Sequence, residues 1–153
     1  MEITFEVAGI PRPGGSKKGF YIPGRNGARG HVAITETGEY TAEWREAVAF
    51  FGSMAMREQA GNVLLTGPLQ VVATMVMPRP KSHYRSNGQL KPNAPKYHTS
   101  KPDATKLWRS TEDALSAIVW SDDSAIAYQT VIKLYANPGE TVGASITVWQ
   151  MEA

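Results

Sequence analysis

The sequence predicts an α+β fold in which a single mixed β-sheet packs against two main helices. Three observations lead to this prediction. Short stretches alternate apolar and polar residues as strands do, two longer segments repeat apolar residues at helical spacing, and the two kinds of segment follow one another in mixed order. Because 153 residues is the size of one ordinary domain, we expect residues 1–153 to form a single domain.

The first half of the chain predicts a strand, an irregular loop, a short strand and a helix. Residues 3–7 alternate apolar and polar side chains and predict a strand. Residues 11–31 are rich in Gly, Pro, Lys and Arg, which favours an irregular loop, and a short strand is expected around 31–34. Thr41 is the expected N-cap of a helix with apolar residues at helical spacing, and Gly61 is its expected end.

The second half predicts a buried strand, a long loop, a helix and two further strands. Residues 68–77 are apolar and β-branched, as buried strands are. The proline-rich stretch 78–102 predicts a long loop, and loops of this length are usually functional. Asp103 is the expected N-cap of a helix over about 104–118. The last expected elements are a strand over 125–135, the turn Asn137-Pro138-Gly139 and a strand over 142–150.

The composition excludes several classes of protein. The chain has no cysteine, which excludes disulfides and thiolate metal ligands and fits a reducing compartment. The N-terminus carries two acids and no basic segment, so we expect no signal peptide. No apolar run approaches the ~18 residues that a membrane helix needs, so we expect no membrane association.

The charges are unevenly distributed although the formal net charge is only +2. No acid occurs between Glu6 and Glu36 or between Glu58 and Asp103, and both stretches contain several Lys and Arg residues. Two long basic loops beside a compact acidic cluster are typical of a protein that holds a polyanion against a metal site. The alternative, that these are ordinary solvated loops, stays open at this point.

Three acids flank the second predicted helix. Asp103 precedes it, and Asp122 and Asp123 follow it. A helix of about 15 residues is ~22 Å long, so its ends can meet only if the chain doubles back along it. Converging carboxylates would form an oxygen-ligand site of the kind that Mg²⁺ prefers. Asp103 as a simple N-cap and the two adjacent aspartates as a simple turn are the alternatives.

The segment from Lys101-Pro102-Asp103, through Asp113-Ala114-Leu115, to Trp120-Ser121-Asp122-Asp123 resembles the signature of the RusA family of Holliday junction resolvases. That family's pattern is Lys-Pro-Asp-x-Asp, a helix with a basic residue and Asp-Ala-Leu, and then Trp-x-Asp-Asp before a strand. The resemblance extends to Lys133, with a looser likeness over residues 40–48 and 78–81.

This resemblance implies a homodimeric, Mg²⁺-dependent endodeoxyribonuclease that resolves Holliday junctions and other branched DNA by phosphodiester hydrolysis, with Mn²⁺ as a second candidate metal. It implies a location in the cytoplasm of a bacterial cell or a phage-infected host, and it leaves open whether the chain is a phage, prophage or host member of the family. Asp103, Asp122 and Asp123 match the expected metal ligands. Asp103 and Asp123 would also be catalytic, and Arg109 matches a helix cation that would hold the scissile phosphate.

One position departs from the family pattern. The second Asp of Asp-x-Asp is Thr105 here, so the expected site loses one carboxylate. Glu112 lies seven residues further on, about 700° around the helix, and hence on nearly the same face ~10 Å along the axis. Glu112 could supply the missing charge, or it could be a solvated surface acid. Asp113 also matches a family position and is expected to cap the helix or orient the site rather than to bind metal.

The sequence is compatible with two main functions and with a third that has less support. The first is a junction-resolving nuclease, and the second is a catalytically weak or inactive branched-DNA-binding protein of the same fold. The third is an RNA-binding α+β module. In the first two, the cations expected to contact DNA are Arg12, Lys17, Lys18, Arg79, Lys81, Arg85, Lys101 and Lys106.

Overall fold

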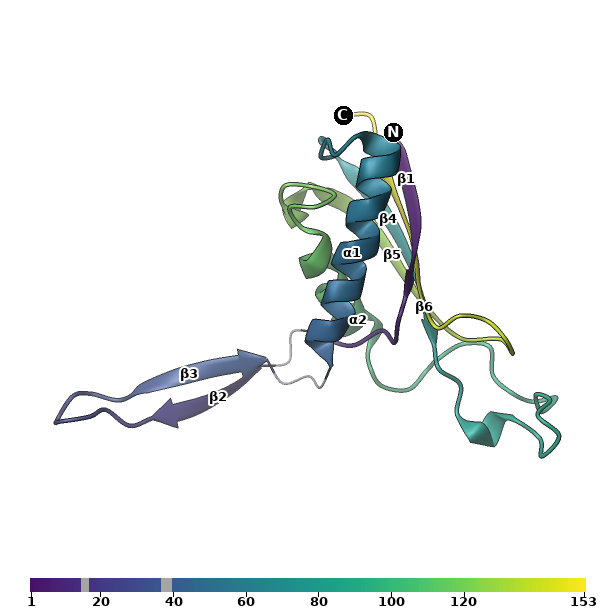
Figure 1. The fold of residues 1–153 in the computed structure, drawn as a ribbon, viewed down its shortest axis with the longest axis horizontal. Coiled ribbons are helices and arrows are strands. Elements are labelled where there is room, and N and C mark those ends of the chain that lie inside the picture. Colours follow the sequence, from purple (N-terminus) through teal and green to yellow (C-terminus); the bar gives the residue numbers. More distant parts are fainter. Residues whose placement is uncertain (15–16, 37–39) are drawn as a thin grey trace.

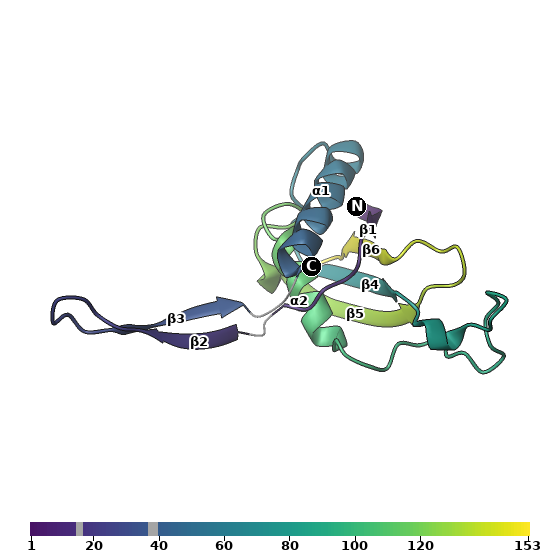
Figure 2. The same ribbon diagram turned by 60° about the horizontal axis from the view of Figure 1, so that its bottom comes forward.

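A four-stranded sheet forms the centre of the molecule, and both helices lie on one of its faces (Figure 1, Figure 2). The computed structural model describes residues 1–14, 17–36 and 40–153, and all of their side chains except those of residues 17–20 and 34–36. The elements are β1 (Glu2–Ala8), β2 (Lys17–Ile22), β3 (His31–Glu36), α1 (Thr41–Ala60), β4 (Leu69–Met77), the short 3₁₀ helix η1 (Lys81–His83), α2 (Ala104–Leu115), the 3₁₀ helix η2 (Asp123–Ala125), β5 (Ile126–Tyr135) and β6 (Gly143–Gln150).

The central sheet is mixed, as predicted. Its strand order is β1-β6-β4-β5, in which β6 is antiparallel to both of its neighbours and β4 is parallel to β5. Parallel strands need a crossover connection, and here the crossover consists of the long loop 78–102 followed by α2. The α+β class is therefore confirmed, and the crossover brings α2 alongside β5.

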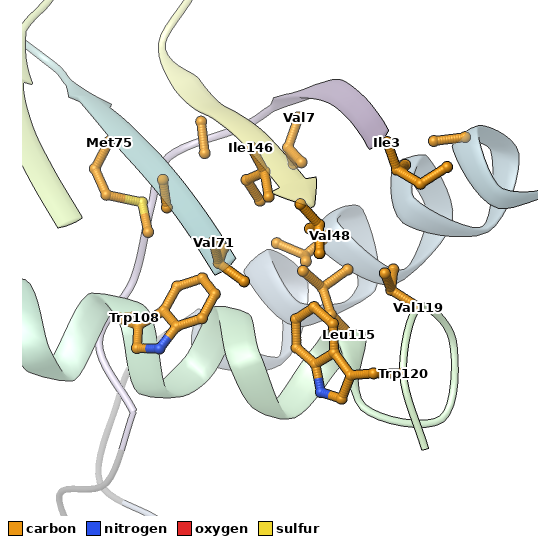
Figure 3. Close-up of a cluster of buried hydrophobic side chains, with 14 of the residues drawn as sticks. Ile3, Val7, Val48, Val71, Met75, Trp108, Leu115, Val119, Trp120 and Ile146 are labelled. Atoms are coloured by element: carbon orange, nitrogen blue, oxygen red, sulfur yellow. The ribbon is translucent and has the colours of Figure 1, made fainter. Parts of the chain in front are cut away.

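The core lies between the sheet and the two helices. Every second residue of β4 is buried, from Leu69 to Met77, which is the pattern of a strand with one covered face. Figure 3 shows Trp108, Leu115 and Trp120 in one cluster with Val71 and Ile146 of the sheet. This packing fixes α2 against the sheet, so the side chains on its opposite face are held at defined positions on the surface.

Helix α1 begins one residue away from the predicted cap. Tyr40 occupies the N-cap position with φ of 64°, and Thr41 is the first helical residue. The Thr41 hydroxyl donates instead to the carbonyl of Pro13, at 2.9 Å, and so ties the segment after β1 to α1. Gly61 ends the helix as predicted, with a φ of 58° that favours glycine.

The prediction of an irregular loop over residues 11–31 was wrong for residues 17–22. Residues 17–22 form β2, which pairs with β3 in a two-stranded hairpin that projects from the rest of the molecule (Figure 1). Tyr21 and Val32 face each other across this hairpin and are 66% and 64% exposed. Because such a ribbon has no face covered by a core, its sequence does not show the usual alternation, and its glycines and prolines resemble those of a loop.

Helix α2 ends at Leu115, three residues before the predicted limit. Ala117 has a φ of 65°, and its N–H donates to the Trp120 carbonyl at 2.7 Å, so the chain turns tightly. Val119 and Trp120 are completely buried, which anchors this turn. Within the described ranges, neither α1 nor α2 is long and apolar enough to cross a membrane.

The contact between α1 and α2 includes a buried polar pair that gives a test of the fold. Trp44 Nε1 donates to Thr111 Oγ1 at 3.1 Å, and the Thr111 hydroxyl donates to the Leu107 carbonyl at 2.8 Å. Thr111→Val should lower the free energy of unfolding by about 1–3 kcal/mol, because it leaves the indole N–H buried without an acceptor. Chemical denaturation measures this, with Thr147→Val, at an exposed hydroxyl pair, as the control. Equal small losses of unfolding free energy in Thr111→Val and Thr147→Val would contradict a stabilising role of the bond between Trp44 and Thr111.

Candidate active site along helix α2

Strand β5 runs antiparallel to α2. The start of the strand therefore lies near the end of the helix, and the end of the strand lies near the start of the helix. Midway, Trp108 Nε1 donates to Gln129 Oε1 at 2.8 Å. At the far end, Lys133 Nζ donates to the carbonyl of Pro102 at 2.8 Å, directly before α2. The chain therefore does double back, but Asp122 and Asp123 precede the returning strand and stay with the last turns of the helix.

Asp123 is held in place by the buried turn before it. Trp120 Nε1 donates to Asp123 Oδ1 at 2.7 Å, and the indole itself is completely buried. One carboxylate oxygen of Asp123 is thus fixed by a rigid ring, and Oδ2 is left to bind another group. The sequence suggested Trp120 only as part of a motif, and this hydrogen bond gives it a positioning role.

Asp122 has a different environment from Asp123. Its Oδ1 accepts a hydrogen bond from the Ser124 backbone N–H at 2.8 Å. The Ser124 hydroxyl, and then this N–H, lower the pKa of the fully exposed Asp122 carboxyl. Asp122 therefore caps η2 in the manner of an aspartate in a turn.

Glu112 lies close enough to Asp123 for the two charges to interact. Burial raises the pKa of Glu112, and the charges of Asp123 and then Asp113 raise it further, against the opposite effect of Arg109. Arg109, Glu112 and Asp113 belong to the last two turns of α2, and Asp123 lies near enough to act on the charge of Glu112. Proximity between Glu112 and Asp123 supports the hypothesis that Glu112 supplies a carboxylate to the site.

The exposed face of α2 carries the other predicted residues. Thr105, Arg109 and Glu112 follow one another at spacings of four and three residues, so they share one face of the helix. Thr105 and Arg109 are exposed. Asp113 lies beside this face, where Asp113 Oδ2 pairs with Arg45 Nη2 of α1 at 3.1 Å. Asp113 therefore links the two helices, consistent with an orienting role.

Asp103 is at the N-cap of α2, but not for the expected reason. Its side chain makes no capping hydrogen bond to the described residues, and it is exposed. The Asp103 carbonyl accepts from the Leu107 N–H, and Lys133 Nζ donates to the carbonyls of both Ser100 and Pro102. The position of Asp103 is thus set by the backbone and by Lys133, which leaves its carboxylate available.

The three predicted metal ligands are not gathered at one point. Among the residues that the structure describes, no three His, Cys, Asp or Glu side chains form a group that could hold a metal ion. Helix α2 has 12 residues and is ~18 Å long, with Asp103 at its start and Asp123 near its end. Mg²⁺ commonly binds through one or two carboxylates plus substrate phosphate and water, and the pair Glu112 and Asp123 fits that donor set.

Comparison with known families gives the class of the protein. Residues 17–147 match the family model described as endodeoxyribonuclease RusA. The chain belongs to the RusA family of endodeoxyribonucleases. The match spans the hairpin, the crossover loop, α2 and β5, and thus every element that contributes to the candidate site. A search of curated proteins found no match.

The predicted DNA-binding cations that follow α1 in this RusA-family chain fall into two groups. Arg79 is used within the protein: Nε donates to the Ala136 carbonyl at 2.9 Å, Nη1 donates to the Pro95 carbonyl at 2.7 Å, and the guanidinium stacks on Tyr135. These contacts brace the crossover loop, a role that the charge pattern did not indicate. The cations that extend into solvent are Lys81, Arg85, Lys101 and Lys106.

Two further sets of predicted cations lie before α1. Arg12 is half-buried, with its guanidinium 5.2 Å from the centre of the Tyr40 ring. Lys17 and Lys18 belong to β2, but their side chains lie outside the described residues.

The contacts of Lys133 predict that it positions the segment before Asp103. Lys133→Met removes both charge-assisted hydrogen bonds, so amide hydrogen exchange over residues 98–104 should become about tenfold faster, with strand β4 unchanged. Lys133→Arg should restore part of the protection. Lys91→Met, at an exposed lysine of the same loop, is the control. Unchanged exchange in Lys133→Met would contradict this role.

Proposed function

We propose that this protein is a Mg²⁺-dependent endonuclease that resolves four-way DNA junctions by phosphodiester hydrolysis. Membership of the RusA family supports the class of reaction. The observation that carries the proposal for this chain is the electrostatic proximity of Asp123 and Arg109 to Glu112, which lies in the last turn of α2. Carboxylates to hold a metal and a cation to hold a phosphate are what such hydrolysis requires.

In this proposal, Asp123 and Glu112 hold Mg²⁺ together with a phosphate of the DNA. Asp123 offers Oδ2, because the Trp120 indole occupies Oδ1. Asp103 and Asp122 remain candidate ligands through the family resemblance. When bound, Mg²⁺ would supply Lewis-acid activation of the scissile phosphate and of the attacking water.

Arg109 contributes a fixed positive charge beside these carboxylates. Its effect on the pKa of Glu112 indicates that it lies within electrostatic range of that carboxylate. A guanidinium can bind two phosphate oxygens at once, and it stabilises the negative charge that develops as the bond breaks. We therefore assign Arg109 to the scissile phosphate and Thr105, on the same face, to a neutral hydrogen bond with the DNA.

The rest of the DNA would be held by the exposed cations of the crossover loop and of α2. Lys81, Arg85, Lys101 and Lys106 are exposed, and the projecting hairpin adds exposed Arg25 and Arg29 near its tip. Because resolution of a junction requires two symmetric cuts, we propose that two copies of the chain act together as a homodimer, as the family resemblance implies.

A second function is favoured by one specific observation. Thr105 replaces a carboxylate of the family pattern, and the described residues contain no preformed group of three metal-binding side chains. A branched-DNA-binding protein with weak or absent nuclease activity fits this reduced site. It shares the fold and the DNA contacts of the first proposal, and only the chemistry differs.

Incubation with a synthetic four-way junction and Mg²⁺ or Mn²⁺ separates the two proposals. The nuclease should produce paired nicks at symmetric positions in opposing strands. Asp123→Asn should reduce the rate by about a hundredfold or more, the scale on which one electrostatic group acts in an active site, while binding without metal is retained. Glu112→Gln should raise the Mg²⁺ concentration needed for half-maximal cutting.

Two further variants complete this experiment. Glu46→Gln, at an exposed position of α1, removes the same charge outside the site and should cut normally. Thr105→Asp restores the carboxylate of the family pattern. Tight binding by the natural chain without nicks, together with nicking by Thr105→Asp, would favour the second function over the first. Full activity in Asp123→Asn would overturn the proposed site.

A further inference from the structure

A cavity of about 320 Å³ lies immediately before the N-terminus of α2. Three segments line it: the chain after β1, the chain after β4, and the end of the crossover loop. β1 and β4 run in the same direction, because both are antiparallel to β6, so the cavity lies beyond their carboxyl ends. The lining residues are Ile10, Pro11, Arg12, Pro13, Met77, Pro78, His98, Lys101 and Pro102.

The cavity is lined by apolar side chains and by two positively charged ones. Proline, methionine and isoleucine supply flat or flexible apolar surfaces, and Arg12 and Lys101 supply two cations. None of the lining residues in the described part of the chain is acidic. A ligand with an aromatic ring and a negatively charged group, such as a nucleotide, complements this combination.

A buried histidine adds a polar group to the same lining. His98 is only 7% exposed, and its Nδ1 has no hydrogen-bond partner among the described residues. Its Nε2 lies 3.4 Å from Ser100 Oγ. Because Nδ1 is itself inaccessible to solvent, a ligand in the cavity would not reach it, and His98 serves here as part of the cavity wall.

The walls of the cavity are fixed from behind by hydrogen bonds. Ser110, which is completely buried in α2, donates to the Arg12 carbonyl at 2.6 Å, and Thr41 donates to the Pro13 carbonyl at 2.9 Å. The Gly14 N–H donates to the Lys106 carbonyl at 2.8 Å, and a Cβ at Gly14 would lie 2.9 Å from Ser110 Cβ, so glycine is needed for this approach.

The opposite wall is fixed by Lys133. Lys133 Nζ donates to the carbonyls on either side of Lys101, and the His98 N–H donates to the Lys133 carbonyl at 3.1 Å. Both walls therefore keep their shape without a ligand. A rigid cavity lowers the entropic cost of binding, which suits recognition of one small group rather than a general surface contact.

We propose that this cavity binds one unstacked nucleotide of the DNA, with the base between the proline and methionine side chains and its 5′ or 3′ phosphate between Arg12 and Lys101. The proposal rests on the proposed function, because it takes branched DNA as the substrate. Bases at the crossover of a junction are less firmly stacked than those within the arms, so removing one from the stack costs less there. The bound nucleotide would anchor the strand that passes Asp103 onto the exposed face of α2.

The proposal is tested with junctions in which single nucleotides around the crossover are replaced by the fluorescent base 2-aminopurine. The fluorescence of this base increases when it leaves the stack. In buffer with EDTA, which prevents cutting, the natural protein should increase the signal at one crossover position. Ile10→Glu places a carboxylate in the cavity at a residue that is 44% exposed, and should abolish the increase. Val63→Glu, at a 70% exposed residue outside the cavity, is the matched control and should retain it.

A second pair of variants tests the phosphate contact. Lys101→Gln should reduce the fluorescence increase and lower the slope of log affinity against log salt by about one, as expected for loss of one phosphate contact. Arg57→Gln, at an exposed cation of α1 that does not line the cavity, should change neither.

The outcomes distinguish this proposal from the proposed function. A fluorescence increase that Ile10→Glu abolishes, in a protein that makes no cuts with Mg²⁺, would support the nucleotide site and overturn the nuclease. Cutting without any increase at the crossover, or an increase that Ile10→Glu leaves unchanged, would overturn the nucleotide site alone. Failure of the natural protein to bind the junction would overturn both.

Discussion

The antiparallel course of β5 along α2 is the constraint on which the rest of the site depends. Two side-chain contacts hold it: Trp108 with Gln129 midway, and Lys133 with Pro102, directly before the helix, at the end of the strand. Trp120 with Asp123 fixes the turn that joins the helix to the strand. Both tryptophans are also core residues, so the surface face of α2 is fixed by the same packing that stabilises the fold. The two ends of the helix thereby acquire different roles. The carboxylates of Glu112, Asp113 and Asp123 lie near the last turns of α2, and the crossover loop is anchored at the first turn of α2.

Much of the fold could be predicted from local patterns, because burial leaves a periodic signal. The alternation along β4, the apolar stripe of α2 and the glycine that ends α1 all appear in the structure close to where they were predicted. The hairpin of β2 and β3 gave no such signal, since neither of its faces is covered by the core. Likewise, Thr41 and Asp103 have the side chains of N-caps, but Thr41 bonds to Pro13 and Asp103 makes no capping bond to the described residues. Local propensity does not determine which distant partner a hydroxyl or carboxylate meets.

Candidate residues for the site could be proposed from the sequence, but their arrangement could not. The motif identified Asp103, Asp122, Asp123 and Arg109, and helical spacing alone placed Glu112 on the face of Thr105. The structure then separates these residues along the helix, with Glu112 electrostatically coupled to Asp123. The roles of Lys133 and Arg79 depend on contacts across 31 and 57 positions in sequence, which no local pattern contains. For this reason a cation in a basic loop can be an internal brace rather than a DNA contact.

The position of the metal along α2 is most directly tested by titrating the isotopically labelled protein with Mn²⁺ alone and following the paramagnetic broadening of its amide NMR signals. Broadening falls steeply with distance from the ion, so it locates the site without requiring catalysis. If Glu112 and Asp123 form the site, the signals of residues 109–113 and 121–124 should broaden first. Asp123→Asn should abolish that effect. Broadening centred on Asp103, with the signals around Glu112 and Asp123 unchanged, would contradict the assignment.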